Sequence, residues 1–169
     1  MTFYGNAVDF DTYHTDRGRT VSASWTTDDI EAALLLASEW LDDMYRNVWS
    51  GYPTDGYSQV RKWPRTTAMT NSFPQYVFTD SEIPTQVVSA TYEAAFRELT
   101  TAGALRKDFT PFKYNKVSIS GALSVEYNTS MTNNDVQLQI PVVGNLMSEL
   151  LENPGQGSLS PYSGGAGRA

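Results

Sequence analysis

The sequence predicts a mainly α protein, a small bundle of three to four helices that carries a β-hairpin and an extended C-terminal tail. Apolar residues recur at helical spacing in several segments. One later segment changes to the alternation of apolar and polar residues that is typical of strands. The end of the chain is rich in Gly, Ser and Pro. We therefore expect a single domain over residues 1–152 and a flexible tail over residues 153–169 that can order on a partner.

Residues 9–18 are predicted to form the first, short helix. Phe10 and Tyr13 give this segment an apolar side, and Asp9 can cap its start. Gly18 can end it, because glycine readily adopts the left-handed conformation that follows many helices.

The strongest helical pattern covers residues 27–49. Thr26 or Thr27 can cap this helix, and acidic residues fill its first turn, where the helix dipole favours negative charge. A continuous apolar stripe is formed by Ile30, Ala33, Leu34, Ala37, Leu41, Met44, Tyr45 and Val48. Leu36 and Trp40 lie on a different face, where they either form a second contact surface or are covered by a later segment of the same chain.

The segment over residues 51–78 is rich in Pro, Gly, Ser, Thr and Tyr, which predicts a long ordered loop with one helical turn near residues 57–62. The next helix is expected over residues 81–102, because Thr79–Pro84 combines capping residues, acidic charge and an early proline. Its apolar residues occupy both sides, which indicates a central helix packed between neighbours.

Beyond this helix, the pattern predicts a β-hairpin over residues 112–128 and a last helix over residues 141–152. Apolar and polar residues alternate on both sides of Ser120–Ala122, and Pro141 is a favourable first residue of a helix.

The composition excludes several kinds of chemistry. The chain has no Cys and a single His, His14, which rules out disulfides, thiolate sites and a His-rich metal site. No nucleophile motif accompanies His14, and we interpret it as an ordinary surface or interface histidine. We therefore predict no enzymatic activity and no cofactor. No segment is apolar enough for a membrane helix and the start lacks a signal peptide, so we expect synthesis in the cytoplasm and no membrane partner.

The net charge of −7 argues against tight binding to nucleic acid. Two clusters nevertheless mix basic and aromatic residues, as proteins that bind single strands do. The first consists of Arg61, Lys62 and Arg65 around Trp63, and the second covers residues 106–116. We favour a solvated loop or a protein-facing role for both clusters, and keep single-stranded DNA binding as an alternative.

Five motifs occur in order along the chain. They are Tyr13–Gly18, Glu31–Arg46, Trp63–Arg65, Glu82–Pro84 and Val125–Tyr127. Together with a short C-terminal helix, and over roughly residues 8–152, this set resembles a family of head-to-tail connector proteins of tailed bacteriophages. Some members of that family carry the label DnaT-like single-stranded DNA-binding protein.

The resemblance implies a structural protein of the virion, made in the host cytoplasm and placed at the head-to-tail junction. It would form a ring of about twelve copies under the portal, extend the DNA channel and give the tail a platform. Its partners would be the portal protein, tail or nozzle proteins and further copies of itself, and genomic DNA would pass without specific binding. The alternatives are a single-stranded DNA-binding module or another ring component such as a tail terminator.

An adaptor ring of this kind would need residues that contact its partners and residues that line the DNA channel. The residues proposed for partner interfaces are Leu36, Trp40, Trp63, Arg65, Leu159 and Tyr162. Glu39, Asp42 and Asp43 would line the channel, where negative charge lets DNA slide.

Overall fold

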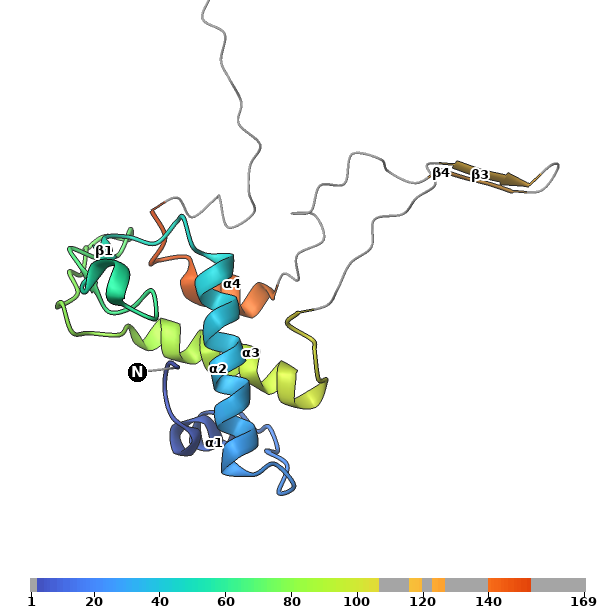
Figure 1. Ribbon diagram of the computed structural model, residues 1–169, viewed down its shortest axis with the longest axis horizontal. Helices are drawn as coiled ribbons and strands as arrows, with labels where there is room; N and C mark the ends of the chain where they lie inside the picture. The colour runs from blue at the N-terminus through green and yellow to red at the C-terminus, as the bar shows by residue number, and fades with distance from the viewer. Residues whose placement is uncertain (1–2, 107–115, 120–122, 127–139, 153–169) are drawn as a thin grey trace, which may run out of the picture.

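The computed structural model describes residues 3–106, 116–119, 123–126 and 140–152 (Figure 1). In chain order the elements are α1 (Ala7–Thr15), α2 (Thr27–Met44), β1 (Tyr52–Pro53), the short 3-10 helix η1 (Gly56–Ser58), β2 (Arg65–Thr66), α3 (Thr85–Thr100), β3 (Lys116–Ile119), β4 (Leu123–Glu126) and α4 (Pro141–Met147). The predicted class, a small helical bundle with a β-hairpin, is confirmed. Among the described residues, no helix is long and apolar enough to cross a membrane.

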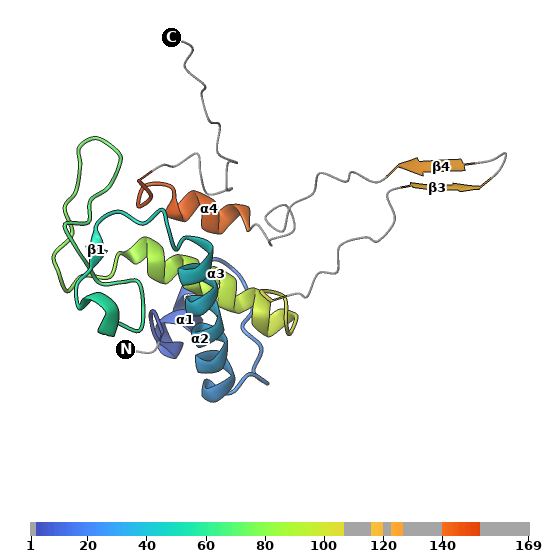
Figure 2. The ribbon, with the colours of Figure 1, turned by 45° about the horizontal axis from the view of Figure 1, so that its top comes forward.

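Helix α3 is the centre of the bundle. It contacts α1, α2 and α4, and α2 crosses it in the middle of the molecule (Figures 1 and 2). Ala90, Ala94 and Ala95 are buried on α3, and such small side chains let neighbouring helices approach closely. The buried Val87 and Tyr92 complete a helix that is covered on more than one side, as the two-sided apolar pattern predicts.

The starts of the first two helices follow local capping chemistry. Asn6, and not Asp9, caps α1, because the Asn6 side chain accepts a hydrogen bond from the Asp9 amide at 2.9 Å. The prediction that Thr26 or Thr27 caps α2 is confirmed for Thr26. Its hydroxyl accepts from the Asp29 amide at 3.2 Å, and the Asp29 carboxylate accepts from the Thr26 amide at 2.9 Å. This reciprocal pair is a capping box.

Helices α2 and α4 end earlier than predicted, at Met44 rather than residue 49 and at Met147 rather than residue 152. The reason is that the segments after the two helices pair with each other. Trp49 and Leu151 form an antiparallel bridge. The flanking hydrogen bonds run from the Ser50 amide to the Leu150 carbonyl at 3.2 Å and from the Glu152 amide to the Val48 carbonyl at 2.9 Å. Extended pairing between distant segments thus replaces the last helical turns.

Helix α3 begins at Thr85, later than the predicted residue 81. Proline disfavours helical geometry in the residue that precedes it, so Pro84 sets the boundary. The residues before it form a turn, in which the Glu82 amide donates to the Thr79 carbonyl at 3.0 Å.

Strands β3 and β4 form an antiparallel hairpin in which Val117 pairs with Val125 and Ile119 with Leu123. They lie inside the predicted range of 112–128, whose remaining residues are outside the described part. Apart from this pairing with each other, the two strands contact no helix and no other strand among the described residues.

The interpretation of His14 as a surface histidine is wrong, because its side chain is fully buried. The ring lies between Phe10 and Phe96, with ring centroids 4.6 and 4.5 Å away. Its Nε2 is 3.1 Å from the Tyr92 carbonyl oxygen. The buried Glu93 carboxylate lies close by and receives the guanidinium of Arg19 at 2.8 Å. A pocket between α1 and α3, with aromatic rings on two sides and the Arg19–Glu93 ion pair beside it, therefore holds this imidazole.

Burial of His14 makes stability depend on pH. Desolvation is the largest effect and lowers the pKa of His14 below its ordinary value. The positive charges of Arg19 and Arg17 lower this pKa further, whereas the Tyr92 carbonyl and the Glu93 carboxylate raise it and offset part of the shift. The unfolded chain then binds a proton more readily than the native one below about pH 6.5. We expect the contribution of neutral, buried His14 to the free energy of unfolding to be fully present above that pH. As the pH decreases below it, this contribution should fall by at most about 1.4 kcal/mol per pH unit.

The measurement is the free energy of unfolding at several pH values for the wild type and for His14→Gln. The variant should lose less stability between neutral and mildly acidic pH. Burial raises the pKa of Asp42, which acts in the opposite direction, but this contribution is common to both proteins and cancels in the comparison. Equal pH slopes for the two proteins would contradict the prediction.

Candidate interaction surface

The connection between α2 and α3 is an ordered loop, as predicted for residues 51–78. Its regular structure is minimal: β1 pairs with β2 over two residues, and Met69 forms a bridge with Val77. The predicted helical turn is the short element η1. Figures 1 and 2 show this loop at one end of the bundle, beside the start of α3.

A column of aromatic rings joins this loop to the core. Successive rings of Tyr45, Trp49, Trp63 and Phe78 meet edge to face, with centroids 5.6, 5.9 and 5.5 Å apart. Tyr76 ends the column on the outside, 4.9 Å from Phe78. Trp63 stands in the middle and is only 1% exposed. Edge-to-face contacts of this kind add to the stabilisation from apolar burial.

Arg65 holds the turns of the loop together. Its guanidinium donates to the carbonyl of Ser50 at 2.7 Å, to that of Lys62 at 3.2 Å and to that of Gly51. Gly51 adopts a left-handed φ of 68°, and a Cβ there would collide with the Thr66 carbonyl. The chain is therefore fixed where it enters the loop.

A buried polar cluster anchors the same loop on α2. The Tyr4 hydroxyl donates to the Asp42 carboxylate at 2.7 Å and accepts from the Trp63 amide at 3.1 Å. Asp42 also accepts from the Lys62 amide at 3.3 Å and lies 3.4 Å from the Arg61 guanidinium. Burial raises the pKa of Asp42, while these partners lower it. The partners thus compensate part of the desolvation of a charged group.

Several residues predicted for surfaces are buried in the domain. The expectation that Trp63 and Arg65 are exposed to a partner is wrong, because both side chains support the loop from inside. Trp40 is buried and Leu36 is half-buried, which agrees with the alternative that the same chain covers this pair. Asp42 is 7% exposed, so it cannot contribute an open charge to a channel.

The other two acidic residues proposed for a channel remain accessible. Glu39 is half-buried and receives the guanidinium groups of Arg61 at 3.5 Å and of Arg106. Asp43 is exposed and pairs with Arg46 at 3.3 Å. Leu159 and Tyr162 lie outside the described residues.

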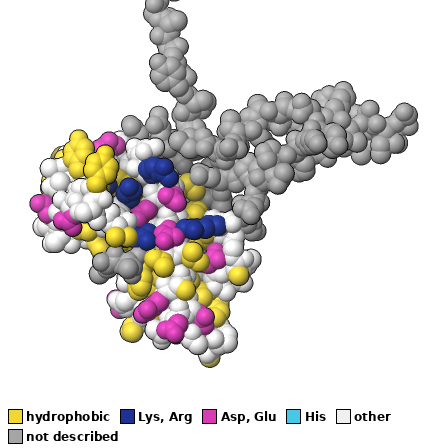
Figure 3. Space-filling view, viewed as in Figure 1, with side chains coloured by type: hydrophobic (Ala, Val, Ile, Leu, Met, Phe, Trp, Pro, Cys, Tyr) yellow, Lys and Arg dark blue, Asp and Glu magenta, His cyan; other side chains and the backbone are white. Residues whose placement is uncertain are grey.

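The loop exposes most of the large apolar side chains at the surface of the described residues. These side chains, which we call the loop surface, are Tyr52, Tyr57, Val60, Met69, Phe73, Tyr76 and Val77. Phe73 is 97% exposed. Figure 3 shows apolar side chains at this end of the molecule, next to acidic and basic ones. Apolar groups gathered on an ordered loop are typical of an interaction site. Sequence reasoning missed them because they follow no helical or strand period.

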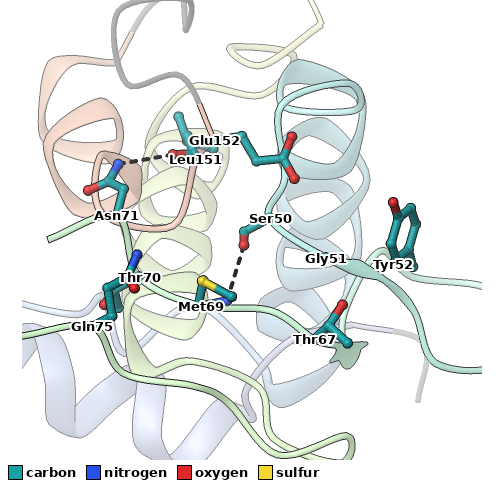
Figure 4. Close-up of a pocket in the computed structure, with 10 residues that line it drawn as sticks. All are labelled: Ser50, Gly51, Tyr52, Thr67, Met69, Thr70, Asn71, Gln75, Leu151 and Glu152. Carbon is teal, nitrogen blue, oxygen red and sulfur yellow. Dashed lines mark hydrogen bonds between the residues drawn. The ribbon is translucent and has the colours of Figure 1, made fainter.

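A cavity of about 340 Å³ opens beside the loop surface. Tyr52 and Met69 line one part of it, and Leu151 and Glu152 line another (Figure 4). Asn71 connects these two parts of the lining, because its side-chain amide donates to the Leu151 carbonyl at 2.9 Å (Figure 4). The cavity therefore lies between the loop and the last described residues of the chain.

The first basic cluster does not form a groove for single-stranded DNA. Arg61, Trp63 and Arg65 are all buried, so they present neither an open cation nor an open ring for base stacking. More generally, every arginine among the described residues contacts a carboxylate, a carbonyl oxygen or an aromatic ring. The second cluster lies, apart from Arg106 and the backbone of Lys116, outside the described residues.

Fold and surface together define a small, mainly helical protein that presents an ordered apolar loop. Within the described residues, no three His, Cys, Asp or Glu side chains are grouped so as to hold a metal ion. The chain belongs to the family described as "Putative DnaT-like ssDNA binding protein", whose model matches residues 3–169. Neither a curated protein nor a solved structure matches the chain. The description of the family favours the single-stranded DNA alternative, and nothing in these comparisons concerns a phage connector.

Proposed function

We propose that this protein is a structural adaptor of a tailed bacteriophage that docks on the portal ring through its loop surface. The observation that carries the proposal is an ordered loop, fixed from inside by Trp63 and Arg65, that leaves large apolar side chains exposed. A rigid apolar loop loses little conformational entropy when a partner covers it, which favours protein association. The Trp63–Arg65 motif that builds this loop is also one of the motifs that resemble the connector family.

The charge of the domain supports a protein partner. Residues 3–106 and 140–152 contain sixteen Asp and Glu against eight Lys and Arg, and the arginines are engaged within the domain. Such a surface repels a polyanion at long range. In an adaptor ring the same repulsion would let genomic DNA slide past accessible carboxylates such as Asp43.

The experiment compares the mass of the portal ring of the same phage with and without the full chain. We expect a discrete mass increment that equals one ring of subunits, and its loss when Phe73 and Val77 are replaced by Ser. Val8→Ser, an exposed apolar position on α1 outside the loop surface, is the control and should keep the full increment. A portal ring whose mass does not change with the wild-type chain would refute the adaptor role.

Single-stranded DNA binding is the second candidate, favoured by the description of the family. It would rest on the second basic cluster, with Arg106, Lys107, Lys113 and Lys116 near aromatic residues. This candidate predicts micromolar or tighter binding to an oligonucleotide, which weakens steeply with salt and is lost in a Lys113→Gln, Lys116→Gln variant. If the adaptor proposal is right, the wild type and this variant bind the oligonucleotide equally weakly.

A further inference from the structure

We propose that the C-terminal segment of the same chain, residues 153–169, docks in the cavity beside the loop surface when the protein is free. This inference deepens the proposed function, because it names what occupies the cavity next to the docking surface before a partner binds. It does not require that the partner is a portal.

The described part of the chain stops beside the cavity. Leu151 and Glu152 already line the cavity, so the segment that follows starts at its edge. Hydrogen bonds also join the loop to residues 148–151, which precede the segment. The Asn71 amide donates to the Glu149 carbonyl at 2.9 Å, and its side-chain amide donates to the carbonyl of Ser148 at 2.7 Å and to that of Leu151 at 2.9 Å. The end of α4 and the loop thus form one unit.

Residues 153–169 have a length and a composition that suit docking in this cavity. The pairing of Trp49 with Leu151 directs the chain away from the loop, so the segment must turn back to enter the cavity. The residues that follow, Asn153–Gly155, have the composition of a tight turn. The segment contains two large apolar side chains, Leu159 and Tyr162. The distance from Glu152 to Leu159 is at most roughly 25 Å along an extended chain, which is ample for a cavity that begins at Glu152.

The charges of the segment and of the residues around the cavity are complementary. Residues 153–169 contain no Asp or Glu, and their one charged side chain is Arg168. Around the cavity, Glu149 and Glu152 are exposed carboxylates. A second copy would have to bring its own acidic domain against this face, whereas the tethered segment brings a neutral to basic one at high effective concentration. The occupant that fits best is therefore the segment of the same chain.

The experiment attaches a nitroxide to the segment and records the amide signals of the full chain by NMR. The chain has no natural Cys, so Ser163→Cys gives a single attachment point. We expect strong loss of signal for the amides of Met69, Thr70 and Asn71, and little loss for those of Ala23 and Ser24 in the turn before α2. Replacing Leu159 and Tyr162 by Gly in the labelled protein should restore the lost signals.

Two results would overturn the inference. Full signal intensity at the cavity in the labelled protein would show that the segment does not dock there. The same signal loss in isotope-labelled chains that carry no nitroxide, when they are mixed with separate nitroxide-labelled chains, would assign the cavity to the segment of a second copy. Because no portal is present in these samples, either result leaves the adaptor role to be decided by the mass measurement.

Discussion

Replacing Trp63 by Ala is expected to lower the free energy of unfolding by about 3–5 kcal/mol, as is usual when a large buried aromatic side chain is truncated. Trp63 is 1% exposed and meets the rings of Trp49 and Phe78 edge to face. The Trp63 amide donates to the Tyr4 hydroxyl, and the Gln59 side chain donates to the Pro64 carbonyl, so the backbone is fixed on both sides of Trp63. The surroundings therefore cannot collapse to fill the space, and much of the void remains. Urea unfolding followed by far-ultraviolet circular dichroism measures the loss.

The matched control is Tyr57→Ala, an aromatic truncation in the same loop. Tyr57 is fully exposed, and its variant should stay within about 0.5 kcal/mol of the wild type. A Trp63→Ala variant as stable as this control would mean that the loop over residues 51–78 is not part of the cooperative core. If Trp63→Ala lowers the free energy of unfolding as predicted, it should also weaken any complex that uses the loop surface. The reason is that the aromatic column around Trp63 supports the loop that carries this surface.

Local patterns were sufficient to predict the helices but not their ends. The apolar stripe of α2 and the Thr26 cap each depend on residues that are close together in the sequence, and both predictions are confirmed. The early end of α2 depends on pairing between Trp49 and Leu151, which are about a hundred residues apart in the chain. No periodicity within either segment carries that information. The same limit applies wherever an extended bridge between distant segments competes with one more helical turn.

Burial of polar and aromatic residues outside regular elements was harder still to predict. Arg65 belongs to a segment with basic and turn-forming residues, which suggests a solvated loop. In the structure its guanidinium satisfies three backbone carbonyls at once. His14 likewise has acidic neighbours in sequence, yet Phe10 and Phe96 enclose it. For His14 the partner that local sequence does not reveal is Phe96, which is distant in the chain, and for Arg65 the partners are backbone atoms, which leave no trace in residue types.

Replacing Asp42 by Ala should lower the free energy of unfolding by about 3–5 kcal/mol, the usual loss when one partner of a buried ion pair is removed. The side chains of Asp42 and Arg61 are each only 9% exposed. Without the carboxylate, the Tyr4 hydroxyl and the Lys62 amide each lose an acceptor. Arg61 keeps Glu39, at 3.5 Å, which reduces the loss but does not replace the acceptor of the Tyr4 hydroxyl and the Lys62 amide. Chemical denaturation measures the difference.

Asp43→Ala is the control, because Asp43 is the next residue on α2 and its pair with Arg46 is exposed. It should change stability by no more than about 0.5 kcal/mol. Asp42→Asn separates charge from hydrogen bonding, since an amide oxygen can still accept from Tyr4. Burial raises the pKa of Asp42, so the charge is already unfavourable in part, and we expect Asn to destabilise less than Ala. Equal losses for Asn and Ala would instead mean that attraction to Arg61, rather than the hydrogen bonds, fastens the loop to α2.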